Sequence, residues 1–146
     1  MSVEVLTGPF DPWRRLQEYQ TERLDAGRYG ATGVFVGTLR DFHAGDAVRG
    51  MTLEHYPGMT EKYLERISRS AAERWGLLDS LILHRIGELA PNDPIVLVAV
   101  WSAHRKEAFE ASRWLMEELK SRAPFWKKER LDAGSERWVE QNTPGV

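Results

Sequence analysis

The fold of this chain is decided at the stretch Leu119-Lys-Ser-Arg-Ala-Pro-Phe-Trp-Lys-Lys-Glu129, where a helix must end and an extended segment must begin. Pro124 cannot continue a helix, and the residue before it is pushed toward extended geometry. Lys120 is therefore expected in the last turn of a helix, and Lys127 on the segment that turns away from it. Two ammonium groups gather around one helix end, although a cation there also simply complements the helix dipole.

Outward from this stretch, hydrophobic periodicity and turn residues predict three helices and a set of strands. Helices are expected at residues 12–25, 59–75 and 104–120, the first with Asp11 as N-cap and Pro12 at its first position. Strands are expected at residues 2–7, 31–39, 49–55, 80–87, 94–101, 125–131 and 137–139, and residues 41–46 are expected to form a loop. Paired strands between helices favour an α+β fold with a mixed or largely antiparallel sheet, formed by residues 1–146 as a single domain.

Composition excludes several classes of protein. The chain has 146 residues with a net charge of −2, so bulk attraction to nucleic acid or to an anionic membrane is not expected. It has no cysteine, which excludes disulfides and cysteine-ligated metal centres, and which means that sulfur cannot be carried as a persulfide on this chain. No signal peptide and no apolar run long enough to span a membrane are recognisable, so a cytoplasmic protein is expected.

Two further places carry residues suited to binding an anion. Arg40 directly follows a predicted buried strand, where its forked guanidinium could clamp a phosphate or carboxylate, although an ordinary exposed loop arginine also fits. His104 and Arg105 open the third helix behind Ser102, the expected N-cap, where free N–H groups favour anions; a capped helix with a solvated arginine is the alternative. We therefore predict one anion-binding pocket from five residues: Arg40, His104, Arg105, Lys120 and Lys127.

The two lysines are the candidates for chemistry within this pocket. A lysine close to other cations has its ammonium form disfavoured, so its pKa falls below the ordinary value of about 10.4 and it can act as a nucleophile or proton donor near neutral pH. Trp126 lies between the lysines in sequence and could wall a pocket for a flat heterocycle. These residues predict a site for an anionic small molecule, with catalysis and plain binding both left open.

Other kinds of site lack their usual signals. The histidines at positions 43, 55, 84 and 104 show no metal-ligand spacing, so no metal is predicted. The chain also contains no Gly-x-Ser-x-Gly, no P-loop and no Gly-x-Gly-x-x-Gly motif, and no cofactor is predicted.

Several segments together resemble one known family. They are Leu53-Glu-His-Tyr-Pro-Gly-Met-Thr-Glu-Lys62, His84-Arg-Ile-Gly-Glu-Leu89, Ser102-Ala-His-Arg105, Ala123-Pro-Phe-Trp-Lys-Lys-Glu129 and Arg137-Trp-Val-Glu140. They resemble, in order, the large catalytic subunits of molybdopterin synthase, the MoaE family. The resemblance implies an α/β-hammerhead fold and a homodimer with one small MoaD-type subunit at each end. It also implies a reaction: sulfur passes from the Gly-Gly thiocarboxylate of that ubiquitin-like subunit to cyclic pyranopterin monophosphate, and two transfers make the dithiolene of molybdopterin.

The resemblance also implies roles for individual residues. The family's two active-site lysines fall on Lys120 and Lys127, and the remaining substrate-binding positions fall on Thr38, Leu39, Arg40, His104, Arg105, Lys128 and Glu129. Lys120 would contact the thiocarboxylate, stabilise an oxyanion or attack the acyl carbon, and Lys127 would assist proton transfer. Some relatives continue with a basic tail that reaches the neighbouring subunit, whereas this chain ends in Gln-Asn-Thr-Pro-Gly-Val. The alternative function is a non-catalytic module that binds a ubiquitin-like tail or an anionic metabolite.

Overall fold

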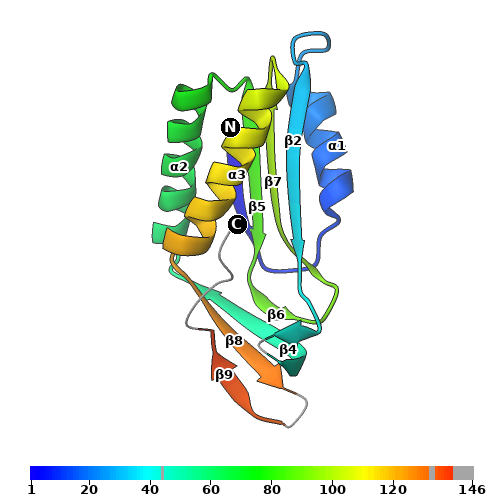
Figure 1. The fold of residues 1–146 in the computed structure, drawn as a ribbon, viewed down its shortest axis with the longest axis vertical. Coiled ribbons are helices and arrows are strands. Elements are labelled where there is room, and N and C mark those ends of the chain that lie inside the picture. The colour runs from blue at the N-terminus through cyan, green and yellow to red at the C-terminus, as the bar shows by residue number, and fades with distance from the viewer. Residues whose placement is uncertain (44, 132–133, 140–146) are drawn as a thin grey trace.

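The computed structural model describes residues 1–43, 45–131 and 134–139, and its helices and strands form two sheets with three helices (Figure 1). In chain order the elements are β1 (Ser2–Leu6), α1 (Pro12–Arg23), β2 (Ala31–Thr38), β3 (Phe42–His43), β4 (Asp46–His55), α2 (Met59–Trp75), β5 (Asp79–Arg85), β6 (Gly87–Leu89), β7 (Pro94–Ser102), α3 (Arg105–Arg122), β8 (Phe125–Leu131) and β9 (Glu136–Trp138).

The first sheet has the strand order β1-β5-β7-β2 and is covered on both faces. β1 pairs with β5 in parallel, while the other two pairings are antiparallel. Because successive side chains of a strand point to opposite faces, Val96, Val98 and Val100 of β7 pack against α2 and α3, while Leu97 and Ala99 pack on the α1 side. β7 is accordingly almost continuously apolar, and β5 carries the apolar run Leu81-Ile82-Leu83 at its centre, as expected for strands buried on both faces.

The second sheet is built around β4 and is antiparallel throughout. β4 pairs with β3, β6 and β8, and β8 pairs in turn with β9. Its small apolar core consists of Leu39, Met51, Leu53 and Leu89. Figure 1 shows this sheet beyond the ends of α2 and α3, so the chain leaves α3 and passes directly into β8.

The α+β fold with three helices and mixed or antiparallel sheets confirms the prediction. Asp11 caps α1 by accepting hydrogen bonds from the backbone of Trp13 and Arg14, and α1 ends at Arg23, two residues before the predicted end. The loop predicted at residues 41–46 was partly wrong, because it contains β3 and the start of β4. β6 was not predicted as a separate strand either. Within the described residues, no helix is both long enough and apolar enough to cross a membrane.

Thr60 connects the start of α2 to the turn between α3 and β8. Its side chain is fully buried, and its hydroxyl donates a hydrogen bond to the Pro124 carbonyl at 3.1 Å and accepts one from the Tyr56 backbone N–H at 3.2 Å. α3 ends at Arg122 because the backbone of Ala123, the residue before Pro124, is already extended, with φ −65° and ψ 140°. The hydrogen bond from Thr60 on α2 therefore holds the turn at Pro124 in place, and this sets the direction in which β8 begins.

Candidate active site

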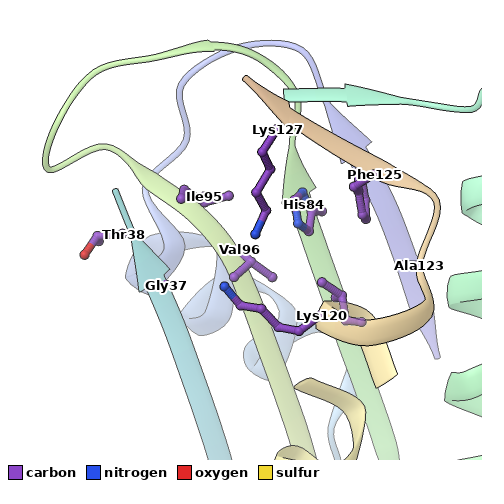
Figure 2. Close-up of a pocket in the computed structure, with 10 residues that line it drawn as sticks. Gly37, Thr38, His84, Ile95, Val96, Lys120, Ala123, Phe125 and Lys127 are labelled. Carbon is purple, nitrogen blue, oxygen red and sulfur yellow. The ribbon is translucent and has the colours of Figure 1, made fainter. Parts of the chain in front are cut away.

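A pocket of about 70 Å³ lies where the ends of α3, β2 and β5 meet the starts of β7 and β8 (Figure 2). It is lined by Gly37, Thr38, His84, Ile95, Val96, Leu119, Lys120, Ala123, Phe125 and Lys127. Since one water occupies roughly 30 Å³ of the liquid, the pocket admits only a slender group. Its polar side chains are the two lysines, His84 and Thr38, so its chemistry is that of a narrow cationic slot with apolar walls.

Lys120 and Lys127 come together in this pocket, as the sequence predicted. Although Lys120 as a residue is exposed on the last turn of α3, its amine reaches into the pocket toward that of Lys127 (Figure 2). The two amines share a hydrogen bond, which raises the pKa of Lys120 and lowers that of Lys127. Lys120 therefore keeps its proton more readily than Lys127 does, and donates it toward its neighbour.

Removal from water lowers the pKa of both amines. For Lys127, desolvation comes first and the Lys120 charge second, and together with the shared hydrogen bond they bring its pKa to about 8, partly offset by the Glu129 carboxylate. For Lys120, desolvation and the nearby Arg40 guanidinium lower the pKa, opposed by the Lys127 hydrogen bond and by Glu117. The pocket thus holds an amine that exchanges its proton close to neutral pH, beside a second amine whose pKa is also lowered.

Replacing Lys127 by methionine should change how stability depends on pH. Between a folded-state pKa of about 8 and the unfolded-state value of 10.5, the unfolded wild-type chain binds more protons, so wild-type stability rises with pH in that window. Lys127→Met removes the buried charge and should be more stable than wild type at pH 7 by roughly 1–3 kcal/mol, with the difference shrinking toward pH 10. Urea unfolding of both proteins at pH 7 and pH 10 measures this, and an equal difference at the two pH values would contradict the lowered pKa.

A second, wider hollow adjoins the lysine pocket and shares Thr38 with it. It measures about 390 Å³ and is lined by Thr38, Leu39, Arg40, Asp41, Pro91 and Asn92. Arg40 lies exposed at this hollow, while the Leu39 side chain is buried in the core of the second sheet. Leu39 contributes through its backbone, which exchanges hydrogen bonds with Asp93 and Asn92 and so fixes the segment that carries Arg40.

His104 and Arg105 do not lie beside the lysines within one chain, so their place in a common anion-binding pocket stays a prediction. They lie at the start of α3, whereas Lys120 lies on its last turn, and fifteen residues of helix separate the two by about 22 Å. Ser102 does not cap the helix through a backbone N–H either. Its hydroxyl donates instead to the His104 carbonyl at 2.6 Å.

Trp126 and Lys128 lie on the opposite face of β8 from Lys127. Trp126 is 47% exposed and does not line the pocket, so the prediction that it walls the site was wrong; Phe125 does so instead. Lys128 pairs with Glu136 at 2.8 Å and lies over the Trp138 ring. Its predicted contact with a substrate stays a prediction.

Glu129 shares the Lys127 face of β8 and is 2% exposed. Its carboxylate accepts a hydrogen bond from Nε of Arg137 at 3.1 Å, and Arg137 also binds Asp46 at 2.8 Å. The carboxylate therefore joins β9 and the start of β4 to β8 and acts electrostatically on Lys127. A direct contact of Glu129 with a substrate stays a prediction.

His84 is a pocket residue that the sequence reasoning missed. It is 3% exposed, lies on β5, and stacks on Phe125 with ring centroids 3.9 Å apart. Its signal in the sequence was a lone histidine at the end of the apolar run Leu81-Ile82-Leu83. Among the described residues, no group of three histidine or acidic side chains could hold a metal ion.

Comparisons with known proteins show the family and the fold of this chain. The family model described as MoaE protein matches residues 8–122. A molybdopterin synthase catalytic subunit from Pseudomonas aeruginosa is 50% identical over 140 residues, which cover 96% of this chain and 91% of the relative. A crystal structure of molybdopterin synthase from Staphylococcus aureus superimposes with a TM-score of 0.83 at 32% identity, covering 94% of this chain and 96% of the other.

A third structure is described as a protein–protein complex of subunits 1 and 2 of the molybdopterin-converting factor from Helicobacter pylori. It superimposes with a TM-score of 0.79 at 23% identity, covering 97% of this chain and 92% of the other, and at that identity it shows a shared fold alone. The family match and the Pseudomonas aeruginosa relative show the family as well as the fold, because both matches span most of the chain. The chain belongs to the MoaE family, that of the molybdopterin synthase catalytic subunits.

Proposed function

We propose that this chain is a sulfurtransferase that moves two sulfurs from a small ubiquitin-like, MoaD-type subunit to cyclic pyranopterin monophosphate, forming the dithiolene of molybdopterin. In this proposal residues 1–146 act as one MoaE-like domain in the cytoplasm, without a bound cofactor. The observation that carries the proposal is the pair of hydrogen-bonded amines, Lys120 and Lys127, in a small pocket of about 70 Å³.

The sulfur must arrive on the partner, because this chain has no cysteine to carry it. The carrier's thiocarboxylate sulfur bonds to a substrate carbon and takes the place of an oxygen there. At one carbon the cyclic phosphate ester is opened and its phosphate oxygen leaves, and at the other the oxygen leaves as water. After each transfer, water cleaves the acyl–sulfur bond. The carrier leaves as an ordinary carboxylate while the sulfur stays on the substrate. Each carrier supplies one sulfur, so two loaded carriers are consumed for each dithiolene.

The lysine slot fits the end of the carrier's tail. A Gly-Gly terminus has no side chains, so its backbone can pass between Phe125 and Val96 where a larger residue would clash. The Lys120 ammonium then binds the thiocarboxylate and stabilises the oxyanion that forms at the acyl carbon. Lys127, with a pKa of about 8, moves the proton.

The wider hollow fits the pterin substrate. Its volume of about 390 Å³ is several times that of the lysine slot, and Thr38 lies at the boundary of the two. The exposed Arg40 guanidinium suits a phosphate, which it can bind with two parallel hydrogen bonds. Substrate in this hollow and tail in the slot would meet beside Lys120.

A homodimer would bring His104 and Arg105 to this site from a second copy. β2 lies at an edge of the first sheet, with Val34 and Phe35 37% and 41% exposed. An exposed apolar edge strand is a template for pairing with another chain.

If two β2 strands pair antiparallel, the start of one lies beside the end of the other. His104 follows Ser102, which pairs with Ala31, so the second copy's His104 and Arg105 would approach Thr38 and Arg40. Two such chains with two small subunits make a heterotetramer.

The function is tested by incubating the chain with a thiocarboxylated small subunit and the pterin monophosphate. We expect a dithiolene product and a small subunit that ends as carboxylate. Binding of the small subunit without product would overturn the proposed catalysis and support the non-catalytic binding module.

Mixed dimers test the arrangement in trans. Lys120→Ala and Arg105→Ala chains are each expected to be inactive alone. If Arg105 acts across the dimer, co-refolding the two variants in equal amounts restores roughly a quarter of the wild-type sites, because each mixed dimer contains one site with both residues intact. No recovery in verified mixed dimers would place Arg105 in the same site as its own Lys120, or outside the site.

A further inference from the structure

His84 is held in one orientation at the wall of the lysine pocket. Its ring lies against Phe125 with an interplanar angle of 17°, and the residue is 3% exposed. It also sits at the end of β5, a strand paired on both sides, by β1 and β7. A ring packed in this way cannot turn over without disturbing Phe125 at the start of β8, so its two nitrogens have fixed surroundings.

The surroundings of Nδ1 decide where the proton of His84 lies. Nδ1 is 2.9 Å from the Arg85 carbonyl oxygen, and a carbonyl can only accept a hydrogen bond. Nδ1 therefore carries the hydrogen. Burial, and after it the Lys127 and Lys120 charges and His55, lowers the pKa of His84 to about 3, so the ring is neutral and Nε2 has no hydrogen. Nε2 is then a hydrogen-bond acceptor, in a pocket whose other large polar groups are amines.

The Lys127 amine is the donor placed to meet this acceptor. Figure 2 shows the Lys127 side chain running beside the His84 ring, with its amine on the pocket side of that ring. Both residues line the same narrow pocket. We propose that His84 is a positioning residue for Lys127, and that its Nε2 accepts a hydrogen bond from the Lys127 amine.

The consequence is a chain of hydrogen bonds with a single direction. Lys120 donates to Lys127, Lys127 donates to His84, and His84 donates to the Arg85 carbonyl, which ends the chain because it cannot donate. The lone pair of a neutral Lys127 is thereby aimed at Lys120 and the mouth of the pocket, where the tail's reacting group would lie. His84 sets the direction in which Lys127 takes up and releases its proton.

Charged and titratable groups face this pair from several elements. They are Lys120 on α3, His55 on β4 and Glu129 on β8, and Arg40 after β2 acts in turn on Lys120. A hydrogen bond to Nε2 favours the ammonium form of Lys127, so losing it should lower the pKa of Lys127 further.

The first measurement is made on the wild-type protein. Nitrogen-15 NMR of the histidine rings should show His84 with hydrogen on Nδ1 and none on Nε2 throughout pH 6–9. A hydrogen on Nε2 would overturn the inference, and this result does not depend on whether any variant folds.

The second measurement is the pKa of Lys127 in variants of His84, followed by NMR of the lysine side chains, with Lys127→Arg identifying the signal. His84→Phe keeps a ring against Phe125 but removes the acceptor, and should lower the pKa of Lys127 by about 1, the size expected for one hydrogen bond to a charged group. His84→Gln can place its amide oxygen near the Nε2 position and should restore most of the value. An unchanged pKa in a folded His84→Phe protein would overturn the inference.

His55→Phe is the matched control for His84→Phe. His55 lies on β4 with Nε2 3.8 Å from Glu61, and it does not line the pocket. The same histidine-to-phenylalanine change there should leave the pKa of Lys127 where it is. An equal shift in the control would assign the effect to general disturbance of the second sheet and overturn the role of His84.

The inference rests on the proposed function only for its turnover test. If Lys127 acts as ammonium, the alkaline limb of the pH–rate profile should move to lower pH in His84→Phe and return in His84→Gln, with kcat affected more than KM. A change in rate without movement of that limb would assign His84 to packing and overturn the positioning role. Absence of wild-type turnover would instead count against the proposed function, while the two NMR measurements would still decide the inference.

Discussion

Lys120→Ala is expected to abolish dithiolene formation while the protein remains folded. The Lys120 residue is exposed on the last turn of α3, while the core is filled by its neighbour Leu119, so truncating the lysine creates no cavity. The substitution removes one of the two amines that meet in the pocket, the one that donates the hydrogen bond to Lys127. Removing one group that stabilises developing negative charge typically costs about 10²–10³ in kcat, and losing the tail's anchor as well should bring turnover below detection. Product formation and a thermal melt on the same sample measure both quantities.

Lys62→Ala is the control for this substitution. Lys62 is an exposed lysine on α2, away from the pocket lining, and its loss should leave turnover near the wild-type value. Turnover by Lys120→Ala comparable to wild type would remove Lys120 from the mechanism. A collapsed melt would show that the residue acts through the fold instead.

Gly33→Ala is expected to destabilise the protein by roughly 2–3 kcal/mol, a large effect for a single methyl group. Gly33 is buried in β2 where α3 crosses the strand, and a Cβ there would lie 2.6 Å from the Ala108 carbonyl oxygen and 3.2 Å from the Ser112 hydroxyl. The first of these is helix backbone, which cannot rotate away as a side chain can. α3 must therefore move outward, and its far end carries Lys120, so activity should fall together with stability. Urea unfolding measures the change in the free energy of unfolding, and the turnover rate reports the displacement of Lys120 with α3.

Gly8→Ala provides the matched comparison. Nothing lies within 4 Å of a Cβ built at Gly8, and its backbone is outside the left-handed region, so the change should be within about 0.5 kcal/mol. Gly33→Ala as stable as Gly8→Ala would show that α3 and β2 are not in tight contact at this point.

The stretch around Pro124 predicted the centre of the site because local chemistry determines it. A proline ends a helix at the residue before it, and the lysines on either side of this helix end are thereby brought close together. The apolar stripe of Ala108, Ala111, Leu115 and Leu119 is likewise a property of one helix, and all four residues are buried as expected. Features that depend on a few neighbouring residues were therefore predicted correctly.

Features that depend on pairing between distant segments were missed. β3 and β6 have two and three residues, too few to show a period, and they are strands because β4 lies beside them. His84 was given no role, since the residues that surround it in the pocket come from the distant elements α3 and β8. Trp126 was assigned to the pocket by its position between the lysines, although the alternation of β8 places it opposite Lys127.

The distance between His104 and Lys120 follows from the predicted helix at residues 104–120, although the prediction of a common pocket did not take it into account. A helix that begins at one residue and ends near the other sets their distance at 1.5 Å per residue. Residues at the two ends of such a helix meet in one pocket only if a second chain supplies one of them. What the sequence could not give was the open edge of β2, which depends on the order of strands in the first sheet.

The pairing of β4 with β8 also affects when the pocket can form during synthesis of the chain. Val48 pairs with Leu131, about 80 residues later, and Lys127 is the last wall of the pocket to be synthesised. Contacts between such remote segments are the slowest to form, and chains grow from the N-terminus at about 5–20 residues per second. A nascent chain can bury its first sheet under α2 while Lys120 still lacks its partner. In the proposed mechanism, sulfur transfer would therefore require a chain that has been synthesised and folded at least as far as Lys127.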